Sequence, residues 1–251
     1  MPTSTVLHSN QKLSMASLKR TRLRLTELWH SHLPNTTSEY TLDMTHRGGT
    51  HSTLLELVPR QSRVLELGCA SGYFGAILKQ QRQCKVWGID SDITALQQIP
   101  QGIYESTNNV DLDHVNEWPL PLQTADVVLM ADLLEHLIRP EQLLIKTHDI
   151  LAPDGLLIIS LPNIAHISVR ISLLFGKFRY KQSGILDRTH LHLYTFHTAC
   201  ELINNTGFTI ENIRSGSNWS GWLLNHPNAS RVAKVLRGLL ATNIIITARP
   251  Q

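Results

Sequence analysis

The chain has 251 residues and a mass of 28.3 kDa, which is enough to bury a sizeable core in one large α/β domain. Hydrophobic residues make up 42% and charged residues 17%, a globular composition that excludes intrinsic disorder. The net charge of +3 arises in the first 50 residues, where six Lys/Arg stand against three acids, so the remainder is neutral. A nucleic-acid-binding protein usually spreads basic residues over its binding face. We therefore do not expect a nucleic-acid partner.

Membrane and secretion signals are not found in the sequence. No apolar run approaches the roughly 20 residues that cross a bilayer, which excludes an integral membrane protein. The first residues lack a charged stretch followed by an apolar one, so we expect no secretory signal. Cys69, Cys84 and Cys200 are odd in number and widely spaced, which excludes a disulfide framework. These features predict a cytoplasmic protein.

Residues 1–49 are expected to form an N-terminal basic amphipathic helix and a linker. Apolar side chains recur at helical spacing between Met15 and Trp29, and Lys19, Arg20 and Arg24 lie on the opposite face. Such a helix packs on the protein body with a solvated basic face, contacts a membrane surface or phosphate, or docks on a protein partner.

Residues 50–251 alternate short β-type runs with helical runs, which predicts a parallel sheet covered on both faces. In such sheets the ligand lies beyond the carboxyl ends of the strands. A turn is expected over 152–155, Gly207 is placed to cap a helix, and 164–206 is expected to cover the acceptor. The expected strands are 63–67, 85–89, 103–111, 125–130, 156–161, 208–214 and 243–249. The expected helices are 51–58, a helix that ends near Gln81, 92–99, 140–151, 165–175 and 198–206.

The first motif is a glycine-rich loop that follows the strand at 63–67. Glycines allow a tight turn and a close approach to a ligand, and a helix N-terminus after them suits a nucleotide. The dinucleotide fingerprint G-x-G-x-x-G fits poorly, because Ala70 stands at its second glycine. Glu66 precedes Gly68 by two residues, where it would repel a pyrophosphate and suit a ligand with an ammonium or sulfonium group. This pattern disfavours a nicotinamide oxidoreductase.

Two further carboxylates follow the next strands. Asp90 stands where a carboxylate accepts hydrogen bonds from a ribose diol; the other role open to it is to cap the next helix, which Ser91 or Asp92 could also do. Asp111 follows the third strand, where a carboxylate binds an adenine amino group or closes a turn.

The successive motifs VLELGCASGYFG, GID, VDLD, ADVVLMADLLEHLIRP and LAPDGLLIISLPN resemble those of class I S-adenosylmethionine-dependent methyltransferases over residues 50–250. The stretch LPNIAHISVRISLLFGKFRYKQSGILDRTHLHLYTF is similar to a bacterial subgroup associated with glycan and polysaccharide biosynthesis. The resemblance implies a Rossmann-like, doubly wound, mostly parallel seven-stranded sheet with an antiparallel last strand. It also implies S-adenosyl-L-methionine as the cofactor, whose methionine part the Gly68–Gly72 loop would line. The cofactor residues implied are Glu66, Gly68, Cys69, Ala70, Gly72, Asp90, Ser91, Asp111, Leu112 and Ala131.

The resemblance also gives individual roles. Glu66 would hold the methionine ammonium directly or through water, and Asp90 would bind the ribose hydroxyls. Asp111 and Leu112 would flank the adenine, and Ala131 and Asp132 would lie near the sulfonium.

Two acids and a histidine lie close together in Asp132-Leu-Leu-Glu135-His136. Metal sites recruit histidine and carboxylate together, but we favour a structural or cofactor-adjacent role, and no metal is expected.

The last motif contains two histidines and a tyrosine. If residues 190–194 are extended, His190, His192 and Tyr194 share one face and form an acceptor pocket. Histidine is the usual general base near neutral pH. We expect His190 to be the catalytic base, with His136 as the second choice.

Taken together, these motifs predict an enzyme that methylates a hydroxyl of a small molecule or glycan by in-line attack on the sulfonium methyl. The alternatives are a quinone-type, protein or RNA acceptor and a non-catalytic subunit that keeps the fold. Fold alone does not identify the acceptor.

Overall fold

In the computed structural model of the protein, the chain divides into two units, Met1–Tyr40 and Thr41–Gln251. The structure describes residues 48–216 and 231–251, without the side chains of 231–235, and all of these belong to the second unit. The expected N-terminal helix lies outside the described residues. Among the helices that are described, none has the length and apolar character needed to span a membrane.

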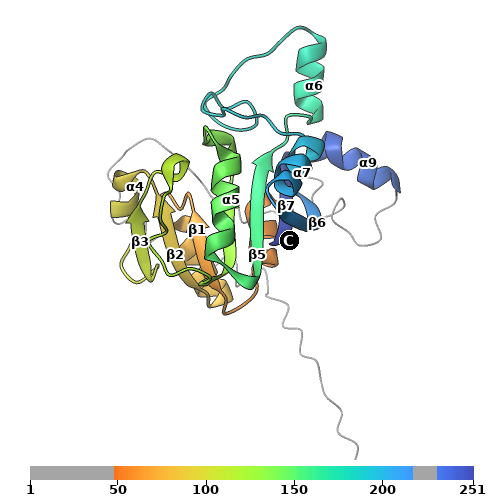
Figure 1. The fold of residues 1–251 in the computed structure, drawn as a ribbon. Coiled ribbons are helices and arrows are strands. Elements are labelled where there is room, and N and C mark those ends of the chain that lie inside the picture. Colours follow the sequence, from red (N-terminus) through yellow and green to blue (C-terminus); the bar gives the residue numbers. More distant parts are fainter. Residues whose placement is uncertain (1–47, 217–230) are drawn as a thin grey trace, which may run out of the picture. The chain divides into compact units, whose positions relative to one another are not determined.

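A seven-stranded sheet forms the centre of the described part (Figure 1). The strands are β1 (Arg63–Leu67), β2 (Lys85–Asp90), β3 (Ser106–Asn109), β4 (Ala125–Ala131), β5 (Leu151–Pro162), β6 (Phe208–Gly216) and β7 (Asn243–Pro250). Their order is β3-β2-β1-β4-β5-β7-β6. The first five strands are parallel, and β7 is antiparallel to both β5 and β6. The mostly parallel sheet with an antiparallel last strand is thus confirmed.

The strand order reverses between β1 and β4. From β1 the chain builds outward through β2 and β3, and it then returns to the other side of β1 with β4. At the carboxyl ends of this pair Leu67 lies opposite Met130. The loops that follow β1 and β4 therefore emerge side by side, at the kind of crevice in which α/β sheets bind ligands.

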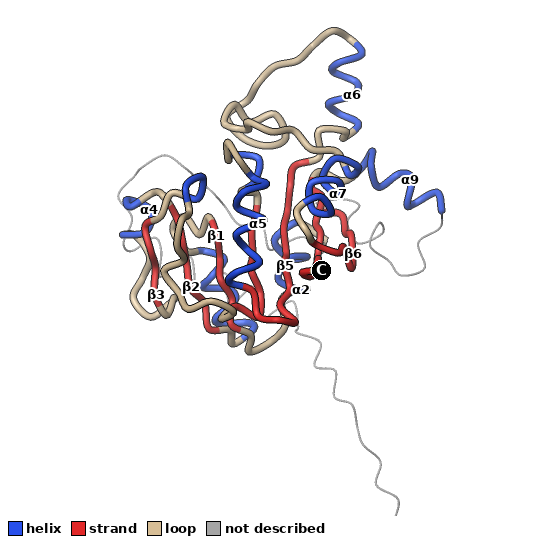
Figure 2. Tube along the Cα trace, viewed as in Figure 1, coloured by secondary structure: helices blue, strands red, loops and turns tan. Residues whose placement is uncertain are grey.

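Helices connect most of these strands (Figure 2). Asp92 caps α4 by accepting hydrogen bonds from the amides of Thr94 and Ala95, and a capping box of Thr195 and Thr198 begins α7. Gly207, with φ +83°, follows α7 as expected. The helices are α2 (Thr50–Leu57), α3 (Tyr73–Ile77), α4 (Ile93–Gln97), α5 (Pro140–Ile150), α6 (Ile167–Leu174), α7 (Phe196–Asn205) and α9 (Arg231–Leu240).

The core lies on both faces of the sheet. Leu65 and Leu67 of β1 belong to one buried apolar cluster with residues of α5 and α7, among them Leu144 and Ile203. The alternate residue Val64 is equally inaccessible but lies outside that cluster. Because successive side chains of a strand point to opposite faces, both faces of β1 are covered. This agrees with the near-continuous apolar runs of the central strands.

Several predicted elements differ from the structure. The helix expected to end near Gln81 is α3 followed by a π-helical turn, Leu78–Arg82. The turn expected over 152–155 is part of β5, whose register with β4 shifts there. The strand expected over 103–111 spans only 106–109 because its residues are largely exposed and polar. The helix α9 was not predicted.

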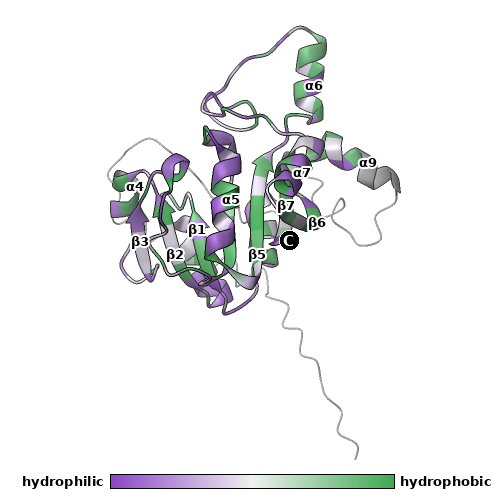
Figure 3. Ribbon diagram, viewed as in Figure 1, coloured by the Kyte–Doolittle hydropathy of each residue, from purple (hydrophilic) through white to green (hydrophobic). Residues whose placement is uncertain are grey.

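Between β5 and α7 the chain leaves the sheet. Asn163 and Tyr194, at the two ends of this excursion, form a single β-bridge. In Figure 1 the chain runs from the tip of β5 through α6 and a long loop before it returns to α7. Much of α6 is apolar (Figure 3), yet Leu174 remains 81% exposed and the adjacent Phe175 70% exposed.

Candidate active site

The glycine loop expected to bind the cofactor turns sharply at the carboxyl end of β1. Gly68 and Gly72 have φ angles of +75° and +81°, which glycine adopts without strain. The amides of Gly68 and Cys69 both donate to the carbonyl of Ile89, at 2.8 and 3.2 Å. The loop is therefore fastened to the end of β2 and leads directly into α3.

Asp90 holds the same loop from the other side. Its Oδ2 accepts a hydrogen bond of 2.7 Å from the amide of Ala70, and its Oδ1 accepts one of 2.8 Å from the amide of Asp92. Ala70 has a φ of +43°, an uncommon conformation for a residue with a side chain. Asp90 thus stabilises the strained backbone of Ala70, which stands where the G-x-G-x-x-G pattern has its second glycine. Helix capping, the other role considered for Asp90, belongs to Asp92, while Ser91 is exposed beside it.

Glu66 is buried beneath the glycine loop, with 3% of its surface exposed. The hydroxyl of Tyr104 donates a hydrogen bond of 2.7 Å to its Oε2. Burial raises the pKa of Glu66 to about 8, although the Tyr104 hydrogen bond acts in the opposite direction. A cationic group placed near this carboxyl would favour its ionised form.

Tyr104 was missed by the sequence reasoning, and glycines make room for it. Cβ atoms added at Gly75 and Gly88 would collide with the Tyr104 ring, and at Gly88 that distance would be 2.9 Å. A Cβ atom at Gly72 would also lie 2.9 Å from the Tyr104 ring. The glycines of this region therefore also shape a slot for the tyrosine that binds Glu66. The only signal in the sequence was an aromatic residue in a weak β pattern.

Asp111 and Leu112 serve the local turn in this structure. Asp111 begins a 3₁₀ turn, Leu112–His114, and accepts hydrogen bonds from the Asp113 amide and the His114 ring. The hydrogen bond from His114 is the main reason for the lowered pKa of Asp111. The side chain of Leu112 is buried in the core.

Asp132 follows Ala131 at the end of β4, in a left-handed conformation with φ +49°. Its Oδ1 accepts hydrogen bonds of 2.7 Å from the Ser160 hydroxyl and 2.9 Å from the Asn243 amide. Neither partner was predicted, since they come from β5 and β7, far away in the sequence. Asp132 is therefore held by the sheet.

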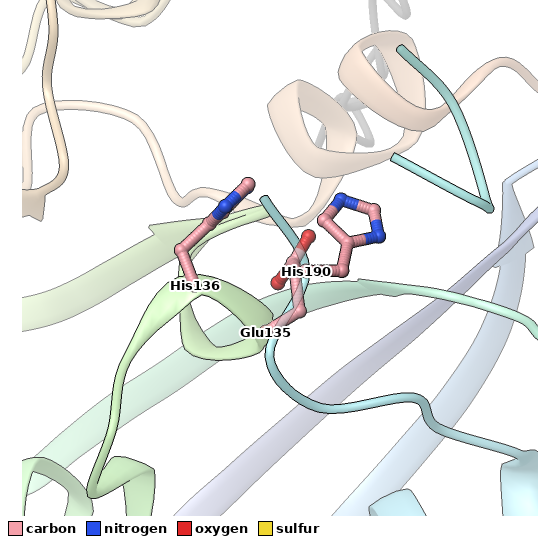
Figure 4. Close-up of side chains that lie close together, drawn as sticks. All are labelled: Glu135, His136 and His190. Atoms are coloured by element: carbon pink, nitrogen blue, oxygen red, sulfur yellow. The ribbon is translucent and has the colours of Figure 1, made fainter. Parts of the chain in front are cut away.

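Three other residues come together beyond the carboxyl end of β4. Glu135 and His136 belong to a 3₁₀ turn, Leu134–His136, and His190 comes from the segment after α6 (Figure 4). One donor atom of each lies within 4.8 Å of the others. The two imidazole rings meet edge to face, with centroids 4.9 Å apart. We call Glu135, His136 and His190 the histidine cluster.

Backbone hydrogen bonds join the two segments of this cluster. The amides of Leu191 and His192 both donate to the carbonyl of Glu135, at 2.7 and 3.1 Å. The structure thus brings together the two predicted catalytic histidines, which are 54 positions apart in the sequence. It also places the cluster near the glycine loop, because Leu133 packs against Gly68.

The carbonyl partners of the two imidazoles fix their neutral tautomers. Nδ1 of His136 lies 3.3 Å from the carbonyl of Thr189, and Nδ1 of His190 lies 3.2 Å from that of Ile185. A carbonyl only accepts, so each Nδ1 carries a proton, and in the neutral form of either ring Nε2 keeps its lone pair. Burial, followed by the neighbouring His136, lowers the pKa of His190. This favours the neutral form that a base or a metal ligand requires.

The extended conformation expected for residues 190–194 is wrong. The amides of Leu191 and His192 both point to the carbonyl of Glu135, whereas successive amides of a strand point in opposite directions. Within 190–194 only Tyr194 forms a β-bridge. Leu191 and Leu193 are exposed, whereas Tyr194 is buried in the core. Tyr194 therefore does not share an open pocket face with the two histidines.

Glu135 is fully buried, and neither of its carboxylate oxygens has a hydrogen-bond partner. Burial raises its pKa well above the usual range, and nearby Asp132 adds to this. The histidine cluster is therefore the group in the described part of the chain that could hold a metal ion.

Comparisons with known proteins agree with this geometry. A family model described as a methyltransferase domain matches residues 46–213. A probable S-adenosylmethionine-dependent methyltransferase of Mycolicibacterium smegmatis is 29% identical over 150 residues, which are 59% of this chain and 52% of that protein. The match thus spans about half the length of that curated relative.

Solved structures share the fold at low sequence identity. A chain from the complex of the Haloferax volcanii Trm112 methyltransferase activator with a putative methyltransferase has a TM-score of 0.57 and 15% identity, with 80% of this chain and 88% of that chain covered. An S-adenosylmethionine-dependent methyltransferase from Mesorhizobium loti has a TM-score of 0.55 and 17% identity, with coverage of 79% and 96%. The chain belongs to the methyltransferase domain family.

Proposed function

We propose that this protein transfers the methyl group of S-adenosylmethionine to a hydroxyl oxygen of a small-molecule or glycan acceptor. The observation that carries the proposal is the histidine cluster, which lies at the strand ends beside the glycine loop. Both of its imidazoles keep an Nε2 lone pair in the neutral form. An acceptor hydroxyl that attacks a methyl group must lose a proton, and such a nitrogen can receive it.

The cofactor side of the proposal follows the strand ends. The Gly68–Gly72 loop, with Cys69 and Ala70, lines the methionine part, and Glu66 holds the ammonium directly or through water. Asp90 and Ser91 bind the ribose. Asp90 supports this role because its carboxylate lies beside the loop and has lone pairs beyond the two backbone hydrogen bonds it accepts.

The adenine and sulfonium ends complete this arrangement. Asp111 and Leu112 flank the adenine, and Ala131 lies near the sulfonium. The exposed carboxylate of Asp111 supports its role, since a turn-forming carboxylate can also accept from an exocyclic amino group.

The acceptor side needs alignment and a base. Alignment of two reactants contributes roughly 7–11 kcal/mol in favourable systems, and a base typically adds about 10²–10⁴-fold. His190 is our first choice for the base and His136 the second. We propose that the insertion 164–206 covers the acceptor: it supplies His190, and the amides of Leu191 and His192 bind the carbonyl of Glu135 after β4, which supports this role.

The test is a methyl-transfer assay with labelled S-adenosylmethionine and a panel of hydroxylated acceptors, beginning with glycans. His190→Ala should lower turnover about 10²–10⁴-fold and leave the affinity for S-adenosylhomocysteine nearly unchanged. The matched control is His192→Ala, since the ring of His192 faces Tyr194 and only its backbone binds Glu135. Unchanged turnover in His190→Ala would remove this residue from the catalytic role.

A quinone-type acceptor carried by a lipid membrane is a second candidate. It is favoured by an exposed surface that we call the α6 surface: large apolar side chains beside cations, with no acid between residues 155 and 186. Exposed apolar groups with Lys/Arg neighbours are typical of segments that lie on anionic bilayers. The residues of the α6 surface are Arg170, Ile171, Leu173, Leu174, Phe175, Lys177, Phe178, Arg179, Tyr180 and Lys181.

Co-sedimentation with vesicles tests the second candidate. The protein should bind vesicles that contain phosphatidylglycerol and not vesicles of phosphatidylcholine alone, and Leu174→Ser with Phe175→Ser should weaken binding. A matched double variant, Ile93→Ser with Leu122→Ser, changes exposed apolar residues elsewhere and should bind normally. Equal binding by both double variants would contradict a role of the α6 surface.

A protein partner that binds residues 1–49, where the sequence predicts a basic amphipathic helix, remains part of the proposal. A solved relative occurs in a complex with a methyltransferase activator, which supports a search for such a partner. A chain that begins at residue 41 should keep the affinity for S-adenosylhomocysteine of the full chain and lose the partner.

A further inference from the structure

Glu135 presents an unusual electrostatic problem. Its side chain is completely inaccessible to solvent, and both carboxylate oxygens lack a hydrogen-bond partner. Buried polar groups in proteins are almost always hydrogen-bonded, and an isolated buried carboxylate is strongly unfavourable. Among the described residues, no salt bridge and no hydrogen bond involves the Glu135 carboxylate. The structure therefore calls for a positive group at this position.

The two imidazoles offer matching donors to the same place. Figure 4 shows the rings of His136 and His190 on either side of the Glu135 carboxylate. Both rings have Nδ1 at a backbone carbonyl. Metal-bound histidines commonly have this arrangement, because the carbonyl fixes the tautomer and directs the Nε2 lone pair to the ion.

The distances suit one ion after a small adjustment. A divalent ion binds imidazole nitrogen and carboxylate oxygen at about 2.0–2.2 Å, so two ligands on opposite sides of it are about 4 Å apart. The donor atoms of the cluster all lie within 4.8 Å of one another. The hydrogen bonds from Leu191 and His192 to the Glu135 carbonyl already hold the two segments at this separation.

Asp132 does not belong to this ligand set, although it lies close in the sequence. Its Oδ1 receives hydrogen bonds from Ser160 and Asn243, which point it to the sheet. The protein thus supplies three ligands, two nitrogens and one carboxylate, and leaves the remaining coordination positions for water or substrate oxygen.

We propose that Glu135, His136 and His190 bind one divalent first-row transition-metal ion, of the Zn²⁺, Mn²⁺ or Fe²⁺ class. Imidazole donors favour these ions over Mg²⁺ and Ca²⁺, which prefer sites made of oxygen alone. The proposal replaces the sequence-based expectation that no metal is bound. It concerns binding, and it therefore stands independently of turnover.

The catalytic use of this ion rests on the proposed function. In the loaded protein each Nε2 would bind the ion; the ion would lower the pKa of a bound acceptor hydroxyl, and water would receive its proton. His190 and His136 then act as ligands. In the metal-free protein the Nε2 of His190 remains the base.

Cobalt(II) titration of the metal-stripped full-length protein tests the site. The d–d absorption of bound Co²⁺ reports both stoichiometry and coordination by nitrogen and oxygen. Wild-type protein should bind one Co²⁺ and release it to Zn²⁺. His136→Ala, His190→Ala and Glu135→Gln should each weaken binding more than tenfold, whereas His192→Ala should bind as the wild type does.

The variants must be compared in the folded state. Thermal unfolding and circular dichroism identify any variant that has lost its fold, and His190→Ala carries the test if the buried Glu135→Gln does not fold. Absence of stoichiometric Co²⁺ binding to the wild type would overturn the proposal. Equal affinity in folded His190→Ala and wild-type protein would also overturn it.

The same experiment separates this proposal from the proposed function. Co²⁺ binding that depends on the cluster, with no hydroxyl acceptor methylated, would leave the metal site standing and contradict the function. Methyl transfer to a hydroxyl by a protein that binds no Co²⁺ would leave the function standing and contradict the metal site.

Discussion

The loops after β1 and β2 and the excursion between Asn163 and Tyr194 are held in place in different ways. The first region is fixed by short hydrogen bonds and close packing around Asp90 and Tyr104. The second exposes much of its apolar surface, including Leu174 and Phe175, and backbone hydrogen bonds to the carbonyl of Glu135 are among its links to the sheet region. The described part of the protein thus combines a closely packed region, where we propose the cofactor binds, with a more exposed region, which we propose covers the acceptor.

The largest expected effect is the pH dependence of stability caused by Glu66. Its folded pKa of about 8 is above its unfolded value of 4.5, so the folded state binds the proton more tightly. This stabilisation is complete below about pH 4.5 and is lost as the pH rises through about 8. The free energy of unfolding of the wild type should fall relative to that of Glu66→Gln by about 5 kcal/mol across this range.

Urea unfolding of the two proteins between pH 5 and 9 measures this difference. Arg63 and Asp126, a partly exposed pair at the other end of β1, give a matched control. Asp126→Asn should show no such trend above pH 5. Parallel pH profiles for wild type and Glu66→Gln would mean that the buried carboxyl does not titrate as described.

The next effect is expected at Gly75. An added methyl group would overlap the ring and hydroxyl of Tyr104, which is buried and also lies close to Gly72 and Gly88. Gly75→Ala should lower the free energy of unfolding by about 3 kcal/mol, as overpacking of a rigid core does. Urea denaturation checks this. Gly238→Ala, in a helix and with open space around the site, should be neutral or slightly stabilising.

A smaller effect is expected for Tyr104→Phe. The variant keeps the ring and removes the only hydrogen bond that the structure gives to Glu66 Oε2. The free energy of unfolding should fall by about 1–3 kcal/mol, and the pKa of Glu66 should rise further, because the hydroxyl now lowers it. Urea unfolding at several pH values measures both quantities. A pKa that is unchanged would contradict the Glu66–Tyr104 contact.

The smallest effect is expected on the α6 surface. Leu174 and Phe175 are largely exposed, so Leu174→Ser and Phe175→Ser should each change the free energy of unfolding by less than about 0.5 kcal/mol. A large loss of stability in thermal unfolding would show that this surface is packed in solution, and the contrast between the two regions would then disappear.

The same contrast explains what the sequence could predict. Strand β1 has the predicted bounds, since its apolar run ends in glycines. The glycine loop, Asp90 and His136 were singled out because short motifs at strand ends contain them, and His190 because a short histidine-rich segment contains it. Tyr104, Ser160 and Asn243 were not, because their roles depend on contacts between distant strands. The conformation of 190–194 was predicted wrongly. Its alternating polar and apolar residues are typical of a strand, but hydrogen bonds from Leu191 and His192 to the Glu135 carbonyl give it another backbone conformation.

Thermal unfolding with S-adenosylhomocysteine, and separately with NADH, tests the central claim most directly. Each ligand is added at high excess over a micromolar dissociation constant. A ligand at about 100 times its dissociation constant stabilises the native state by roughly 2.7 kcal/mol. The account predicts a clear increase in Tm with S-adenosylhomocysteine and none with NADH. No shift with S-adenosylhomocysteine, together with calorimetry that detects no binding, would contradict the enzyme described here.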